Sequence, residues 1–478
     1  MTRASTAAGG RAAPAVLSAL LDLLEGHRAA FRQERPFRRA QALAVGQVLA
    51  LGRRTLTQCL VALGVVDADW TAFYRLLSRP RLDYATLTRC LLRHLLVLAE
   101  ALEPWVVVVD QVQMPRASQK MPGTAWLKAP RTPVWRPGIH RAQRFVHLAW
   151  LTPRTAQGYS RALPLRLEPA CPEKAVRPAG LPARKEWEAA LALLRWLRAE
   201  LDAAGRAAQP LLALGDGVYS TAPFLAGLPE RTVVLARCAK NRALFQLPGP
   251  QQGRGRRRKY GNQGPHPAEV LRARGAWRQA ELLVRGRTIP VRYRVVGPYV
   301  LRGAAARPVF LLVVGGIERR RGRRLVRRAP SFWLVTATQR ERGWALPLPA
   351  ETLLAWAWQR WEVEVTHREL KAGFGVGEAQ CWGRVSALLA VQWQAWCYSL
   401  LVLAGYRVLG LGGGPTPPGR WWRGSPRWSL ARLLRAVRQE CWHLPEIRGG
   451  WSGTSTTWLK TEAWLAAQSA ATLGAQRL

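Results

Sequence analysis

Three acidic residues, far apart in the chain, have sequence surroundings typical of a metal-binding site. Asp110 closes the apolar run WVVVVD, and Asp216 closes a second apolar run, PLLALGD. Such short runs predict buried strands, and the ends of strands at one edge of an α/β sheet are where ligands gather. Because neighbouring carboxylates repel each other unless a cation neutralises them, this pair of aspartates indicates a site for a hard divalent ion such as Mg²⁺.

A third carboxylate comes from residues 357–371, AWQRWEVEVTHRELK, which have helical periodicity. Arg360, Glu364 and Lys371 share one helical face because they are spaced by four and seven residues. Glu364 would complete a cradle of three carboxylates, and the two cations could hold phosphates. Such a site suits in-line displacement at a phosphodiester, which uses two metal ions about 3.5–4 Å apart. Taken singly, each aspartate has the alternative role of capping a turn or a helix.

Other polar residues on the same predicted helix have weaker claims to chemistry. Glu362 and Glu369 fall off the face of the third carboxylate, and we expect them to be solvated. His367 lies one turn beyond that carboxylate; we expect a surface or phosphate-contacting residue, with approach to the site as the alternative. Trp358 and Trp361 are expected in the core, with stacking on an unpaired base as the alternative.

The elements that must position these residues follow from the hydrophobic pattern. Residues 14–102 have helical spacing. Between residues 104 and 237 the order of three strands, helix, strand, helix and strand predicts a mixed α/β sheet, and a Gly- and Arg-rich loop then leads into a β-rich insertion. The predicted domains are a helical DNA-binding domain (1–103), the first part of the core (104–237), the basic β-rich insertion (238–345), the second part of the core with the glutamate helix (346–410), and a linker with a C-terminal helical segment (411–478).

The charge of the chain indicates a polyanionic partner. Its 72 Lys and Arg residues exceed its 29 Asp and Glu residues, which leaves a net charge of +43. Nucleic acid best relieves such self-repulsion, since cations that bind phosphates release counterions; an anionic membrane surface and a GC-rich genome that inflates Arg are the alternatives. The predicted DNA contacts are Arg53 and Arg54 at the start of a possible helix-turn-helix (or of a plain helical bundle), Lys240, Arg242, and, in a Gly-rich loop, Arg256, Arg257, Arg258 and Lys259.

The remaining composition predicts a cytoplasmic protein with no membrane contact. Seven cysteines show no C-x-x-C spacing, so neither a disulfide framework nor a zinc knuckle is indicated. The N-terminus lacks the continuous apolar segment of a signal peptide. The longest apolar stretch, residues 386–405, contains Gln392 and Gln394 and predicts a buried helix rather than a membrane span.

The motifs around the three acids resemble those of DDE transposases of bacterial insertion sequences, whose catalytic domain has the RNase H-like fold. The resemblance spans most of residues 104–405. Arg360, Glu364 and Lys371 match the spacing of the family's Y-x₂-R-x₃-E-x₆-K pattern, and DGVY at residues 216–219 is similar to its second-Asp motif. Ala357 stands where the tyrosine is expected, and DQVQ at residues 110–113 lacks the threonine often found there. The wide gap between the second Asp and the Glu resembles members with a β-rich insertion.

The resemblance implies a function for each matched residue. Asp110, Asp216 and Glu364 would hold two Mg²⁺ (or Mn²⁺) ions, while Arg360 and Lys371 would grip DNA phosphates. The reaction would free 3′-hydroxyls at terminal inverted repeats and join them to target DNA, and a dimer would act in the DNA complex. Two alternatives remain: a catalytically idle DNA-binding descendant of a transposase, and an RNase H-fold nuclease without strand transfer.

Overall fold

The computed structural model describes residues 15–65, 69–99, 104–130, 132–133, 135–251, 254–321, 324–414 and 427–443. The chain divides into two compact units. The first unit comprises Met1–Leu91, Lys371–Gln380 and Trp393–Leu478, and the second comprises Leu92–Leu370 and Cys381–Gln392. Each unit is therefore assembled from separate stretches of chain.

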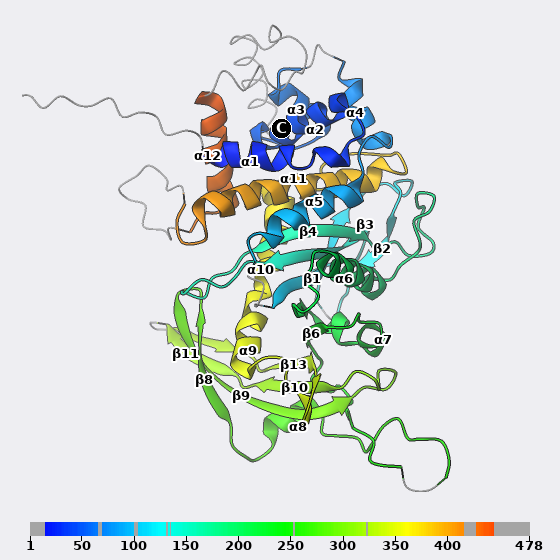
Figure 1. Cartoon of the computed structure of the whole chain (residues 1–478), viewed down its shortest axis with the longest axis vertical. Coiled ribbons are helices and arrows are strands. Elements are labelled where there is room, and N and C mark those ends of the chain that lie inside the picture. Colours follow the sequence, from blue (N-terminus) through cyan, green and yellow to red (C-terminus); the bar gives the residue numbers. More distant parts are fainter. Residues whose placement is uncertain are drawn as a thin grey trace, which may run out of the picture. The chain divides into compact units, whose positions relative to one another are not determined.

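The first unit is helical, as the spacing of apolar residues predicts (Figure 1). The backbone N–H of Leu17 in α1 donates to the Glu440 carboxylate of α12 at 2.7 Å, which joins the two ends of the described chain. Thr55 caps α3, where its hydroxyl accepts from the N–H of Gln58. The helices are α1 (Ala15–Glu25), η1 (Arg28–Ala30), α2 (Glu34–Leu49), α3 (Leu56–Ala62), α4 (Thr71–Ser78) and α12 (Leu430–His443), with the first part of α5 (Tyr84–Leu96) and most of α11 (Ser386–Leu409).

A mixed sheet of 11 strands forms the second unit. Strands β1 (Trp105–Pro115), β5 (Leu211–Gly215) and β6 (Thr232–Arg237) are parallel neighbours, and β3 (Ile139–Leu151) pairs antiparallel with β1. β4 (Ala162–Pro169) and β2 (Thr124–Lys128) both pair with β3. The first six residues of β1 and all of β5 are buried, which agrees with their continuous apolar sequences. This mixed arrangement confirms the expected RNase H-like core.

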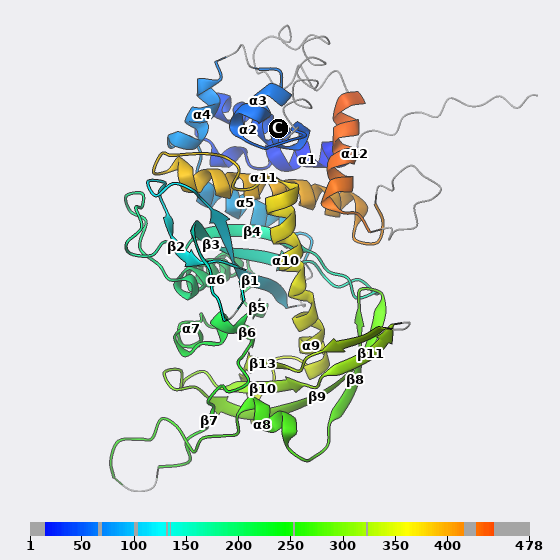
Figure 2. The ribbon, with the colours of Figure 1, turned by 180° about the vertical axis from the view of Figure 1, so that it is seen from behind.

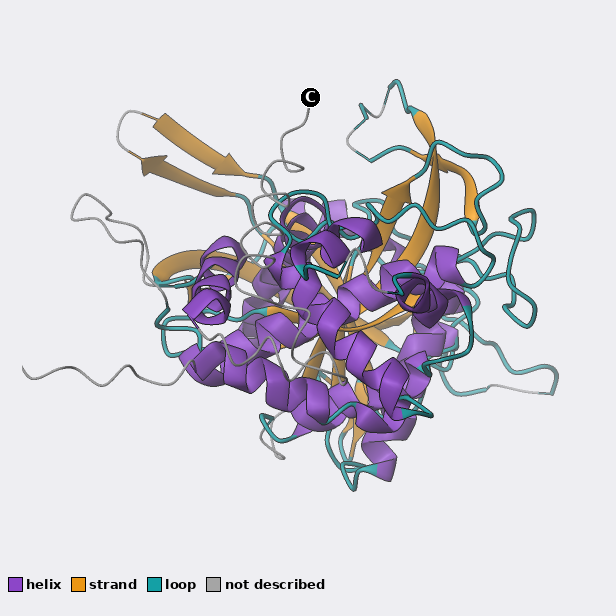
Figure 3. Ribbon diagram, turned by 90° about the horizontal axis from the view of Figure 1, so that it is seen from above, coloured by secondary structure: helices purple, strands orange, loops and turns teal. Residues whose placement is uncertain are grey.

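The strands of the basic insertion continue this sheet rather than forming a separate one. β13 (Ser331–Thr336) pairs antiparallel with β6, and β10 (Val309–Val314) joins β13 to the far edge. That edge is formed by β9 (Arg287–Val300), β7 (Phe245–Gln246) and β8 (Arg278–Val284). Two short hairpins lie off the sheet. One pairs β11 (Ile317–Arg321) with β12 (Arg324–Arg328) and projects outward in Figure 3; the other pairs β14 (Thr338–Arg340) with β15 (Gly343–Ala345).

Helices cover both faces of the sheet in the second unit. α6 (Glu186–Ala203) lies in front of β1 in Figure 1, whereas α10 (Trp361–Arg368) lies in front of it in the reverse view of Figure 2. α9 (Ala350–Gln359) precedes α10 and buries Leu353 and Leu354 in one core cluster with the strands. Shorter helices are η2 (Gly217–Ser220), α7 (Ala222–Ala226), α8 (Pro267–Arg272) and the π-helical turn η3 (Glu369–Gly373).

Helix α11 is long and apolar enough to cross a membrane, but 94% of its most apolar window is buried within the protein. Its polar side chains also have partners within their own units: Gln392 donates to the Leu167 carbonyl at 2.9 Å, and Gln394 donates to the Arg54 carbonyl at 2.9 Å. The burial agrees with the expected core helix. Satisfied amides of this kind are typical of the interior of a folded protein.

Candidate metal centre

Asp110 lies on β1, and Asp216 lies at the same level directly after the neighbouring parallel strand β5. The last paired residues of β1 and β5 are Val108 and Leu214. Asp110 follows Val108 by two residues, and Asp216 follows Leu214 by two residues. Asp216 comes directly after β5, as expected. Asp110 does not end its strand, because β1 stays paired with β3 as far as Pro115. Only the parallel pairing of β1 with β5 stops before Asp110, at Val108. The two carboxylates therefore lie where β1 and β5 separate.

Helix α10 brings a third carboxylate to Asp110. Ligand atoms of Asp110, Glu364 and His367 all lie within 4.8 Å of one another. Oxygen and imidazole nitrogen atoms at this separation can contact one shared ion, since metal–ligand bonds measure about 2.0–2.3 Å. Asp216 is not a member of this close cluster, although its charge acts on Asp110. The tertiary structure therefore brings Asp110 and Glu364 together with a histidine and leaves Asp216 outside this close cluster.

The electrostatics of Asp110 favour a bound cation. The pKa of its carboxyl group is raised to about 7, chiefly by burial, and the negative charges of Glu364 and Asp216 act in the same direction. The Arg360 guanidinium and the N–H of Gln111, which donates to Asp110 Oδ1 at 2.8 Å, act in the opposite direction. A buried carboxylate beside like charges is costly when ionised. A divalent ion would remove that cost, so the residues present fit a metal.

Arg360 lies between two of the acids. Its guanidinium is 3.4 Å from Asp110 Oδ2 and 3.8 Å from Glu364 Oε1. Both separations exceed the roughly 2.7–2.9 Å of a tight charge-assisted hydrogen bond. The guanidinium therefore orients the carboxylates loosely and keeps donor capacity for a phosphate. Ala357, at the position where a tyrosine was expected, is buried in the core.

Asp216 begins a short turn and lies near a fourth acid that the sequence did not single out. Its carboxylate accepts from the N–H of Val218 at 2.9 Å. Burial raises the pKa of Glu186, at the start of α6, and the charge of Asp216 raises it further. Glu186 accepts from the Tyr219 hydroxyl at 3.2 Å and faces Arg144 at 3.5 Å. The one available signal was its position at a helix N-terminus, which is too common to indicate a site.

The expectation that His367 lies at the surface is wrong. His367 is only 8% exposed, and its Nε2 lies 3.0 Å from Nδ1 of His147, which is fully buried. His147 is the strand partner of Asp110 across β1 and β3. Burial lowers the pKa of His147 to about 3, so its ring is neutral. The sequence did not indicate His147, because a histidine within an apolar strand cannot be assigned to a functional site until its cross-strand partner is known.

The expectation that Glu362 and Glu369 are solvated is also wrong. Glu362 is 1% exposed and pairs with Arg285 at 2.5 Å, while Glu369 pairs with Arg161 at 2.5 Å. Glu362 lies in α10 and Glu369 begins η3, and charges buried in this way must be paired. The two ion pairs tie these segments to the chain that flanks β4, β8 and β9. Trp361 is 56% exposed, whereas Trp358 stacks under the Arg328 guanidinium at 4.2 Å.

The predicted DNA contacts are placed differently from one another. Lys240 is exposed, and Arg242 reaches the Ser220 hydroxyl at 3.4 Å, in the turn that Asp216 begins. Lys371 lies in η3, where the chain passes into the first unit. Arg256, Arg257, Arg258 and Lys259 are all exposed on the long loop between β7 and α8, and Arg53 is exposed after α2.

Arg54 differs from its neighbour because it is buried. Its guanidinium donates to the carbonyls of Gln47 and Gly373, both at 2.8 Å, and lies 5.2 Å from the Phe374 ring centre. Its backbone N–H donates to Glu378 at 2.8 Å. These contacts join α2 to the segment Lys371–Gln380 within the first unit. This placement favours a structural role for Arg54.

Substitution of these adjacent arginines should separate stability from binding. Arg54→Ala leaves two buried carbonyls without donors, so we expect the free energy of unfolding to fall by about 2–4 kcal/mol. Arg53→Ala should leave stability within about 0.5 kcal/mol and weaken binding to duplex DNA. Thermal denaturation and fluorescence anisotropy measure the two effects. Equal loss of stability in both variants would contradict the assignment.

A comparison with protein families identifies the fold family of this site. The model of the DDE superfamily endonucleases matches residues 25–294, which is more than half of the 478 residues. The chain belongs to the DDE superfamily of endonucleases. These enzymes use divalent metals and act on DNA. The matched region includes Asp110 and Asp216 but ends before Glu364, and a comparison with curated proteins finds no match.

Proposed function

We propose that this DDE endonuclease is a transposase that cuts DNA at transposon ends and joins the freed 3′-hydroxyls to target DNA. The observation that carries the proposal is the meeting of Asp110 and Glu364, from distant parts of the chain, beside the strand that leads to Asp216. Three carboxylates with flanking cations suit phosphodiester chemistry. The proposal places the protein on DNA in a bacterial cytoplasm, with two copies acting in the DNA complex.

The residues of the site would have two roles, metal binding and phosphate binding. Asp110, Asp216 and Glu364 would hold two Mg²⁺ or Mn²⁺ ions, and His367 offers a further ligand atom to the pair formed by Asp110 and Glu364. When bound, such ions activate an attacking oxygen and neutralise the leaving oxygen. Arg360 would hold phosphate oxygens beside the scissile bond, and Lys371 is a second proposed phosphate contact. Because the pKa of buried Asp110 is raised, a bound divalent cation would favour its ionised form.

The proposed reaction has two steps of the same kind. In the first, water attacks a phosphorus atom at the element end, the P–O3′ bond breaks, and a 3′-hydroxyl and a 5′-phosphate result. In the second, that 3′-hydroxyl attacks a phosphorus atom of target DNA and displaces the target strand's own 3′-hydroxyl. No covalent bond to the protein forms. The same carboxylates can serve both steps because both are in-line displacements.

Two assays test the proposal against its alternatives. Purified protein with Mn²⁺ or Mg²⁺ is given a plasmid that carries the DNA flanking its gene, and then a pre-cut end with a second plasmid as target. A transposase nicks at the ends and joins the pre-cut end. Absence of nicking would indicate an idle DNA-binding descendant, and nicking without joining would indicate a nuclease that lacks strand transfer.

A further inference from the structure

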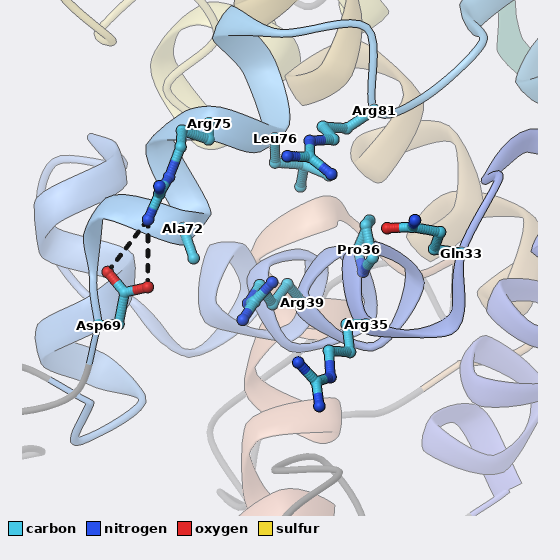
Figure 4. A pocket seen from close by; sticks show the side chains of 9 residues that line it. All are labelled: Gln33, Arg35, Pro36, Arg39, Asp69, Ala72, Arg75, Leu76 and Arg81. Atoms are coloured by element: carbon cyan, nitrogen blue, oxygen red, sulfur yellow. Dashed lines mark hydrogen bonds and ion pairs between the residues drawn. The ribbon is translucent and has the colours of Figure 1, made fainter.

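A groove lined by arginines crosses the helical first unit. Two adjoining cavities, of about 250 Å³ and 330 Å³, share Gln33, Pro36 and Arg81 in their walls. Figure 4 shows the residues that line the cavity of about 250 Å³, with α2 on one side and α4 with the following turn on the other. We call this feature the arginine groove. Its cationic members are Arg32, Arg35, Arg39, Arg75, Arg79 and Arg81.

Local structure brings these six arginines together. Arg35 and Arg39 are one helical turn apart on α2 and so share a face. The segment that follows α4 returns alongside the start of α2, because Phe31 and Leu82 form an antiparallel bridge. That bridge sets Arg81 beside Arg32. The clustering is therefore a property of the folded unit, since the two arginine groups are about 40 residues apart in sequence.

The positive charge of the arginine groove is not neutralised within the described chain. Asp69 is the acid in its lining, and that carboxylate pairs with Arg75 at 3.2 Å (Figure 4). The side chains of the other five arginines make no ion pair or hydrogen bond to another described residue, although the charge of Arg39 also acts on Asp69. By contrast, Arg28 and Arg38 on the same segment both pair with Glu34, at 2.6 Å and 2.7 Å. Five unpaired guanidinium groups in one groove indicate an anionic ligand.

We infer that the arginine groove binds the phosphate backbone of duplex DNA. Guanidinium groups present paired donors that match phosphate oxygens. The described lining contains no aromatic side chain, so it lacks the stacking platform that single strands use. Contacts to phosphates position a protein on DNA without reading its sequence. The inference rests on the proposed DNA-cutting function and assigns the first unit the task of holding the duplex, separately from the carboxylates of the second unit.

Salt dependence of DNA binding tests this inference on the full chain. The probe is a fluorescein-labelled duplex of 30 base pairs and arbitrary sequence, followed by anisotropy in EDTA between 50 and 200 mM KCl. Each lost phosphate contact lowers the slope of log K against log [salt] by about 0.9. We therefore expect Arg35→Gln/Arg39→Gln, and separately Arg79→Gln/Arg81→Gln, to lower the slope by about 2 and to weaken binding roughly tenfold at 150 mM.

The matched control is Arg28→Gln/Arg38→Gln, which removes the same charge from the same segment but from outside the groove. We expect its slope to stay close to that of the parent protein. The two groove variants alter different segments, so a folding defect in one leaves the other as a test; thermal denaturation identifies it. Unchanged slopes in a folded groove variant would overturn the inference, as would stronger competition by single-stranded DNA or RNA than by duplex.

Failure of the groove inference can be distinguished from failure of the proposed transposase function. If the parent protein nicks plasmid DNA while the groove variants bind and nick normally, the groove inference fails alone. If the parent protein binds duplex DNA with the expected salt dependence but never nicks it, the transposase proposal fails and the groove remains. Loss of duplex binding in the groove variants, with the Mn²⁺ affinity of the carboxylates unchanged, supports the groove.

Discussion

Glu364→Gln should reduce metal-dependent DNA cleavage by roughly 10³-fold or more while leaving DNA affinity unchanged. The amide keeps the shape of the side chain but removes the negative charge that faces Asp110 across the cluster. Because the Glu364 side chain is 41% exposed, the fold does not depend on it. Plasmid nicking measures cleavage, and anisotropy with a labelled duplex measures affinity.

Glu362→Gln is the matched control, two residues earlier on the same helix. Glu362 is buried and pairs with Arg285, so this variant should lose about 1–3 kcal/mol of stability and keep its cleavage activity at low temperature. The two variants should therefore differ: Glu364→Gln loses cleavage activity and keeps stability, whereas Glu362→Gln loses stability and keeps cleavage activity. Full cleavage by Glu364→Gln, or by Asp216→Asn in the same assay, would remove these carboxylates from the proposed mechanism.

Loss of the His367 ring should weaken Mn²⁺ binding by about 10–100-fold, and His147→Phe should have a comparable effect. His367 offers a ligand nitrogen close to Asp110 and Glu364, and Nδ1 of His147 lies 3.0 Å from its Nε2, where it would orient the His367 ring. Mg²⁺ is a hard ion that takes oxygen ligands, whereas the transition-metal ion Mn²⁺ also accepts an imidazole nitrogen. Mn²⁺ affinity should therefore fall more than Mg²⁺ affinity in His367→Ala.

Electron paramagnetic resonance of bound Mn²⁺ measures this directly, without catalysis. The parent protein should show the coupling of a directly bound nitrogen, and His367→Ala should lose that coupling. His266→Ala is the control, because His266 caps α8 in the insertion. A nitrogen coupling that persists without His367, or equal Mn²⁺ affinity in all variants, would show that His367 is not a ligand.

Local patterns in the sequence determined the elements that carry the site. The runs WVVVVD and PLLALGD are apolar throughout, so they form strands buried on both faces, and the structure has them as β1 and β5. The hydroxyl of Thr55 caps a helix because capping depends only on the following three residues. The spacing of Arg360 and Glu364 set both on one helical face, and their side chains lie 3.8 Å apart.

Contacts between distant segments were decided by the tertiary structure. The end of β1 could not be located from its own residues, because its length past Asp110 depends on pairing with β3. His147 and His367 are 220 residues apart, and no local pattern links them. Adjacent Arg53 and Arg54 look alike in sequence, yet only Arg54 is buried, and one of the two carbonyls to which it donates belongs to the distant residue Gly373. Periodicity reports which face of an element is apolar, whereas a partner across the fold is chosen by the packing of the whole chain.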